Sequence, residues 1–70
     1  MPRLPGIHHR RAIAAFRRAG FDVVRESKHV IMSNEHRTIT IPRHDPIDAY
    51  TMAAIVQDAG LTLDQFRELL

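Results

Sequence analysis

The hydrophobic positions near the start of the chain follow a helical period. Over residues 9–19, apolar side chains recur at spacings of three and four, and arginines fall on the opposite side. This pattern predicts an amphipathic helix whose core face consists of Ala12, Ile13, Phe16 and Ala19. Gly20 follows directly and predicts the end of this helix.

Three short strands are predicted next. Residues 21–26 alternate weakly, residues 29–32 are rich in β-branched side chains, and residues 38–41 alternate Thr and Ile before Pro42. A tight link near Ser27 and a turn over 33–36 would join them. We expect one set of strand residues to face the helices: Val30, Met32, Ile39 and Ile41. The two-residue period of a strand then turns the other set toward the open face of the sheet: His29, Ile31, Thr38 and Thr40.

Two further helices complete the expected fold. After an irregular connection over 43–47, Asp48 can cap a helix that runs to Ala59 and ends at Gly60. A short last helix begins at Thr62, which has capping-box spacing with Gln65. The fold class is therefore α+β, with a helix, a three-stranded antiparallel sheet, a helix and a short C-terminal helix, and with the helices on one face of the sheet.

The length and composition narrow the class of protein. Seventy residues fit a single domain, 1–70, with a small core. The chain has no cysteine, which excludes disulfides and thiolate zinc sites, and no apolar run approaches the ~20 residues of a membrane span. We expect a cytoplasmic protein that does not interact with membranes.

Charge is distributed unevenly along the chain. Residues 1–44 contain nine basic and three acidic side chains, a net charge of +6, whereas residues 45–70 contain one basic and five acidic side chains, a net charge of −4. Nine of the ten basic residues are Arg, whose planar guanidinium suits phosphate. The asymmetry indicates a surface for a polyanion, with the acidic segment kept away from it, although a solvated basic surface without a partner is equally compatible.

The histidines do not suggest a metal site. His8 and His9 are adjacent and cannot easily share one ion, and no carboxylate recurs at ligand spacing near them, His36 or His44. We therefore expect no metal and no other cofactor. Tyr50 could stack on a base, although capping or packing is the commoner role of a lone aromatic residue.

Several segments together resemble the HicA-type (YcfA-like) mRNA interferase toxins. They are Leu4-Pro5-Gly6, the helix end Arg18-Ala19-Gly20-Phe21 with Val23-Val24-Arg25, the segment Ser27-Lys28-His29-Val30-Ile31-Met32, the strand end Thr40-Ile41-Pro42-Arg43-His44, and Ile55-Val56-Gln57-Asp58-Ala59-Gly60-Leu61. The two positions before His29 carry Ser and Lys where that family carries Gly and Ser, and the link is about one residue shorter.

The resemblance implies a fold similar to the double-stranded-RNA-binding domain, cleavage of mRNA, and a HicB-like antitoxin as partner. It implies His29 as the catalytic residue. Imidazole can take the proton of a 2′-OH at cellular pH without a metal. We expect RNA to be bound by Lys28, Arg10, Arg11, Arg17, Arg18, Arg25, Arg43 and His44. His44 could also act as the acid for the leaving group.

Two other functions remain open from the sequence. Residues 51–69 can be written as a helix-turn-helix for DNA, but its second helix carries Asp64 and Glu68 against only Arg67, which disfavours a phosphate-lined groove. The other alternative is a non-catalytic RNA-binding or interaction module of the same fold, which the altered Ser27-Lys28 favours. Exposure of His29 with basic groups nearby would favour the nuclease.

Overall fold

The computed structural model describes residues 6–70, so Leu4 and Pro5, where the resemblance begins, lie outside the described residues. The elements follow the predicted order: α1 (His9–Arg18), β1 (Asp22–Glu26), β2 (His29–Ser33), β3 (Thr38–Pro42), α2 (Ala49–Asp58) and α3 (Leu63–Leu69). The predicted α+β class, with its short C-terminal helix, is confirmed.

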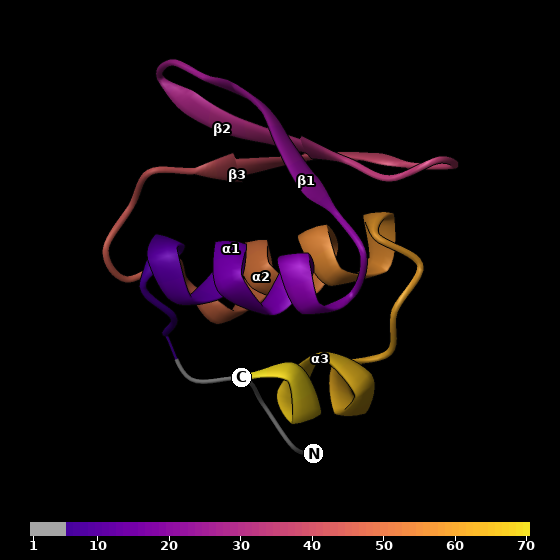
Figure 1. The fold of residues 1–70 in the computed structure, drawn as a ribbon. Helices are drawn as coiled ribbons and strands as arrows, with labels where there is room; N and C mark the ends of the chain where they lie inside the picture. Colours follow the sequence, from indigo (N-terminus) through magenta and orange to yellow (C-terminus); the bar gives the residue numbers. More distant parts are fainter. Residues whose placement is uncertain (1–5) are drawn as a thin grey trace.

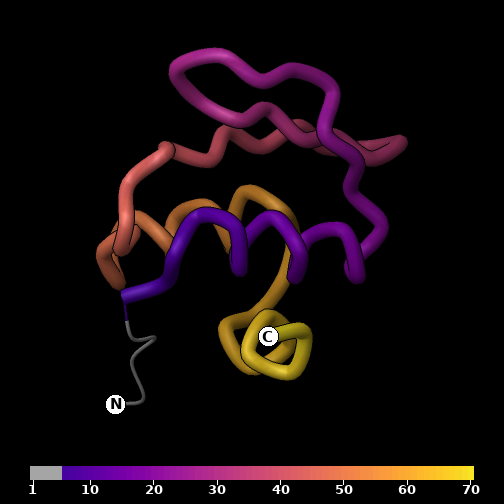
Figure 2. The backbone as a smooth tube through the Cα atoms, turned by 60° about the vertical axis from the view of Figure 1, so that its left-hand side comes forward, coloured from indigo at the N-terminus to yellow at the C-terminus, as the bar shows by residue number. Residues whose placement is uncertain are grey.

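The three strands form an antiparallel sheet in the order β1-β2-β3. Helices α1 and α2 lie side by side beneath one face of the sheet, and α3 lies on the side of these helices away from the sheet (Figures 1 and 2). Every second residue of β2 and β3 is buried against the helices, namely Val30, Met32, Ile39 and Ile41. Within residues 6–70, no helix lies on the other face of the sheet, as predicted.

Each described helix begins with a side-chain cap. His8, Asp48 and Thr62 are the N-caps of α1, α2 and α3, and Thr62 forms a complete capping box with Gln65. Helices α1 and α2 end in the same way, with Gly20 at φ 99° and Gly60 at φ 79°. These glycines are needed because side-chain-bearing residues rarely adopt a positive φ.

The core joins all three layers. The Phe16 ring of α1 lies 5.0 Å from the Phe66 ring of α3 and 5.8 Å from Phe21, measured between ring centroids. The predicted core face of α1 needs one correction: Ile13 and Ala19 are only partly buried, whereas Ala15 is fully buried. The reason is that α3 packs against α1 through Phe66 and Phe16, whereas Ile13 and Ala19 pack against the core as partly buried residues.

The connection between β3 and α2 is tied to the segment before α1. The backbone N–H groups of Ile7 and Ile47 each donate to the carbonyl of the other residue, at 3.1 and 2.7 Å. Both isoleucines are buried. In the described part of the chain, no helix has the length and apolar character needed to cross a membrane.

Candidate functional site

His29 lies at the start of β2 with its side chain exposed. Its cross-strand partner is Pro42, the last residue of β3. Cross-strand partners point to the same side of a sheet, so His29 is on the open face with Ile31 and Thr40, as the alternation predicted.

The turn before His29 is held in place by the end of β3. The Arg43 guanidinium donates from one NH group to the Ser27 carbonyl at 3.1 Å, and the Ser27 N–H donates to the His29 carbonyl at 3.0 Å. Lys28 lies at the tip of this turn and is exposed. Arg43 therefore holds this turn by a hydrogen bond and also lies near His29.

A β-bulge brings Arg25 to the same face. The register of β1 against β2 shifts between Val23 and Arg25, so that Val24 has no partner and Arg25 pairs with Ile31. Arg25 is thus a diagonal neighbour of His29, a separation of roughly 7–8 Å that a long side chain can cross. The weak alternation of residues 21–26 did not predict the bulge.

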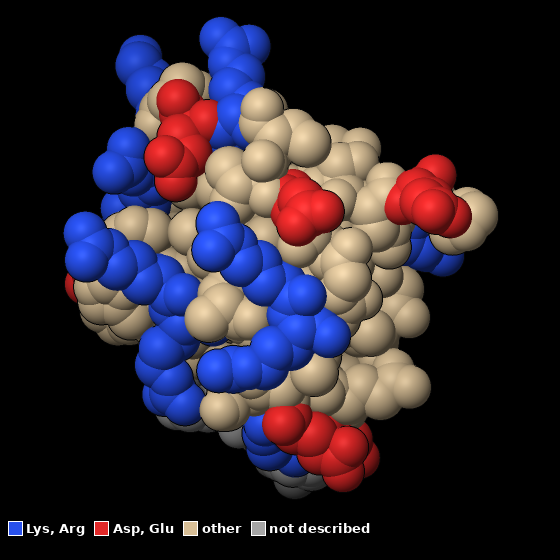
Figure 3. All heavy atoms as spheres, in the orientation of Figure 1, with Lys and Arg blue, Asp and Glu red and all other residues tan. Residues whose placement is uncertain are grey.

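The four predicted arginines of α1, which are Arg10, Arg11, Arg17 and Arg18, are all exposed. Figure 3 shows basic groups gathered over α1 and over the β1–β2 hairpin on the face in view, with a few acidic groups between them and at the edges. Arg18 differs from the other three because its guanidinium also donates to the Leu69 carbonyl at the end of α3. It is therefore a structural residue of the helix layer as well as a candidate phosphate contact.

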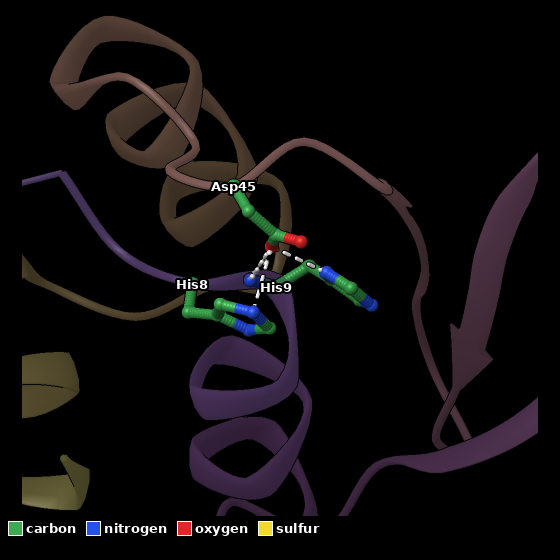
Figure 4. A group of neighbouring side chains, drawn as sticks. All are labelled: His8, His9 and Asp45. Carbon is green, nitrogen blue, oxygen red and sulfur yellow. Dashed lines mark hydrogen bonds and ion pairs between the residues drawn. The ribbon is translucent and has the colours of Figure 1, made fainter.

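The structure places a carboxylate beside His8 and His9, which the spacing along the chain did not predict. One oxygen of Asp45, Oδ1, lies 2.6 Å from His9 Nδ1, 3.1 Å from the His9 backbone N and 3.3 Å from His8 Nε2 (Figure 4). The hydrogen bond from the His9 ring, assisted by the His9 backbone N–H and both imidazoles, holds the pKa of Asp45 below its usual value of 3.8. Asp45 also lies at the positive end of α1, which favours a negative charge there.

The geometry of this cluster suits hydrogen bonds better than a metal ion. The potential ligand atoms of its three residues lie within 4.8 Å of one another. The two imidazoles, however, are stacked with their planes 20° apart and their centroids 4.9 Å apart, whereas an ion must lie in the plane of each ring that binds it. In addition, His8 Nδ1 accepts the Arg10 N–H, so the neutral ring carries its proton on Nε2, the atom that faces Asp45.

A cavity of about 290 Å³ opens at the end of β3. It is lined by Pro42, His44, Pro46, Ile47, Asp48 and Thr51. Pro42 belongs to this wall and is also the cross-strand partner of His29, so the cavity and the histidine are neighbours. The expectation that the acidic segment stays away from the basic surface is wrong here, because Asp45 and Asp48 flank the same connection as Arg43 and His44.

The predicted residues thus fall into two groups. Lys28, His29, Arg25, Arg43 and His44 come together around the end of the sheet where β2 begins and β3 ends. The α1 arginines form a separate group on the helix layer.

Comparison with protein families matches residues 9–61 of the chain to the model described as the HicA toxin of bacterial toxin-antitoxin. Comparisons with curated proteins and with solved structures give no significant match. The match includes α1, the whole sheet, α2 and His29, and it ends before α3. It spans more than half of the 70 residues, and its order of elements is the one described above. The chain therefore belongs to the HicA toxin family of bacterial toxin-antitoxin systems.

Proposed function

We propose that this toxin binds mRNA and cleaves it as a metal-independent endoribonuclease, with His29 as the general base. The observation that carries the proposal is the position of His29, exposed on the open sheet face among Lys28, Arg25 and Arg43. A histidine tucked against the helices would have favoured a binding module instead.

The proposed reaction is a transesterification within the RNA. His29 takes the proton of the 2′-OH, and the 2′ oxygen attacks the adjacent phosphorus. The bond from phosphorus to the 5′ oxygen breaks, leaving a cyclic 2′,3′-phosphate, and the 5′ oxygen receives a proton. Lys28, Arg25 and Arg43 would stabilise the negative charge that develops on the phosphate oxygens.

The sheet keeps His29, the proposed general base, in a fixed position. His29 is paired with Pro42, and the turn before it is clamped by Arg43, so the imidazole is attached to an ordered part of the sheet. Such attachment lowers the cost of orienting the base toward the 2′-OH. The sequence Ser27-Lys28, which differs from the Gly-Ser of the family, therefore forms a defined turn in this chain.

His29→Ala tests the proposal. General-base assistance typically contributes ~10² to 10⁴-fold, so the variant should cleave single-stranded RNA slower by that order, with EDTA present. RNA affinity and the melting temperature should stay close to wild type, because the side chain is exposed. Cleavage rates on several RNAs, binding titrations and thermal melts measure the three quantities.

His36→Ala is the matched control, since His36 is also exposed but lies in the turn between β2 and β3, at the other end of the sheet. It should cleave like wild type. Equal cleavage by His29→Ala and wild type would remove His29 from catalysis. A wild-type protein that binds RNA and cleaves none of the RNAs tested would establish the non-catalytic module.

We also propose that the partner is a HicB-like antitoxin that covers the His29 face. A partner that binds only the folded toxin raises its melting temperature by mass action, and this effect matters for a domain with a small core. Co-expression from the native operon should yield a complex that melts higher than the toxin and cleaves no RNA. If this co-expression yields the toxin without a partner, and the toxin does not harm the cells, the proposed pairing is wrong.

A further inference from the structure

We propose that the cavity at the end of β3 holds one base of the bound RNA, next to the phosphate that is cleaved, and prefers bases with an exocyclic amino group. This inference rests on the proposed function, because it assigns a substrate subsite beside His29. The ligand is adenine, cytosine or guanine within a single-stranded segment.

The position of the cavity is the first argument. Pro42 is both the cross-strand partner of His29 and part of the cavity wall, and His44 follows two residues later on the same wall. An RNA strand whose 2′-OH reaches His29 therefore lies close to the wall of the cavity. The volume of about 290 Å³ is near the lower end of the range for small-ligand pockets, roughly 300–1,000 Å³.

The lining suits a base and disfavours a phosphate. Pro42, Pro46 and Ile47 give apolar walls, and the His44 imidazole offers an aromatic face for stacking. The carboxylate of Asp48 belongs to the same lining and repels phosphate oxygens. The phosphates would instead follow Lys28 and Arg43 outside the cavity.

Asp48 gives the cavity its hydrogen-bonding preference. Its Oδ1 accepts the Thr51 N–H at 3.1 Å as the N-cap of α2, and its second carboxylate oxygen is a further hydrogen-bond acceptor. An acceptor matches the amino groups of adenine, cytosine and guanine. Uracil has no amino group, and its single ring N–H lies between two carbonyl oxygens, which a carboxylate repels.

The cavity walls are held before any RNA binds. Asp45, directly before Pro46, is bonded to His8 and His9, and Ile47 is bonded to Ile7 through two backbone hydrogen bonds. Asp48 is fixed by its cap contact to Thr51. A wall fixed in this way loses little conformational freedom when a base binds. The cavity can therefore select between bases and not only bind all of them alike.

Asp48→Asn tests the preference without removing the cap. Asn caps helices as well as Asp, but it presents an amino group where Asp48 presents its second oxygen. The test uses full-length His29→Ala protein, so that RNA is bound and not cleaved, with oligoadenylate, oligocytidylate and oligouridylate. We expect about tenfold tighter binding of the first two over oligouridylate. Asp48→Asn should shrink or reverse this ratio.

Two further variants make the test specific. Asp58→Asn makes the same change of charge at the other end of α2 and should leave the ratio unchanged. His44→Ala should weaken the binding of all three RNAs by about tenfold, because a base can no longer stack on the imidazole. Backbone amide shifts of Asp48 and Thr51 in NMR titrations should follow the bound base.

An unchanged ratio in Asp48→Asn, or amide shifts that bypass the cavity, would overturn the subsite. Failure of the proposed function would look different. A wild-type protein that cleaves no RNA, while Asp48→Asn still alters the ratio, would remove the nuclease and leave the subsite. Cleavage of RNA by wild type, together with the same binding ratio in Asp48→Asn and in the protein with Asp48, would support the nuclease and remove the subsite.

Discussion

Asp45 shows how a single residue can connect distant parts of the chain. It follows β3, yet its carboxylate accepts hydrogen bonds at the start of α1, 36 positions earlier. The backbone bridge between Ile7 and Ile47 brings the two segments together. No spacing in the sequence signals this contact, because only the folded sheet and helix place the carboxylate beside the two imidazoles.

The depressed pKa of Asp45 predicts a pH effect on stability. Because the folded-state pKa lies below 3.8, this carboxylate stabilises the fold above that pH, and the stabilisation is lost as the pH falls through the lower folded value. Asp45→Asn should therefore melt lower than wild type at neutral pH, and the difference should shrink below about pH 3.8. Thermal melts of both proteins across this range measure it.

Asp58→Asn is the reference for this measurement, because Asp58 is an exposed carboxylate that lies outside the Asp45 cluster. It should leave the pH dependence of wild type unchanged. A difference between Asp45→Asn and wild type that persists undiminished at low pH would show that the Asp45 contacts do not depend on its charge.

At the scale of elements, α1 and α2 end in matching Schellman motifs. The N–H of Phe21 donates to the Phe16 carbonyl at 3.0 Å, and the N–H of Leu61 donates to the Val56 carbonyl at 3.1 Å. The ends differ in one respect. At Gly60, Arg37 packs so closely that a Cβ would lie 2.8 Å from its Nε, and Arg37 also donates to the Asp58 carbonyl.

This difference predicts unequal costs for the same substitution. Gly20→Ala should cost about 1–2 kcal/mol from the positive φ alone, because nothing lies within 4 Å of the added Cβ. Gly60→Ala should cost that amount and a further ~0.5–1.5 kcal/mol, because Arg37 must move and lose its hydrogen bond. Urea unfolding of both variants measures the difference, and adding Arg37→Ala should remove it. Equal costs would mean that Arg37 contributes nothing to the end of α2.

The periodic pattern predicted the elements well because burial in the strands follows the spacing within each strand, whereas burial on α1 also depends on the packing of α3. Ile39 and Ile41 face the helices and Thr38 and Thr40 face solvent for this reason. The bulge at Val24 and the cavity beside His44 depend on pairing between segments, so no local pattern encodes them. The position of His29 was predicted because the alternation of β2 alone determines it.

At the scale of the whole molecule, the basic groups extend from the β1–β2 hairpin to α1 (Figure 3). RNA affinity should therefore fall steeply with salt, and each lost phosphate contact should lower the slope by up to about one unit. Arg17→Ala and Arg18→Ala should both reduce the slope. Only Arg18→Ala should also lower the melting temperature, since Arg18 holds the end of α3.

Binding titrations at several salt concentrations, together with thermal melts, measure both effects. A salt-independent affinity would rule out phosphate contacts by this surface. Equal melting temperatures of the two variants would show that the Leu69 contact adds no stability.

The bridge between Ile7 and Ile47 has a consequence for the order of folding. The sheet is made of consecutive hairpins, whose residues are near one another along the chain, whereas this bridge closes a loop of about forty residues. Closing so long a loop costs more entropy than forming a hairpin. During synthesis, the hairpins can form first, and the loop bearing His44 reaches its final place only after Ile47 has left the ribosome. Hydrogen exchange should reflect this order, with the Ile7 and Ile47 amides opening more often than those in the middle of β2.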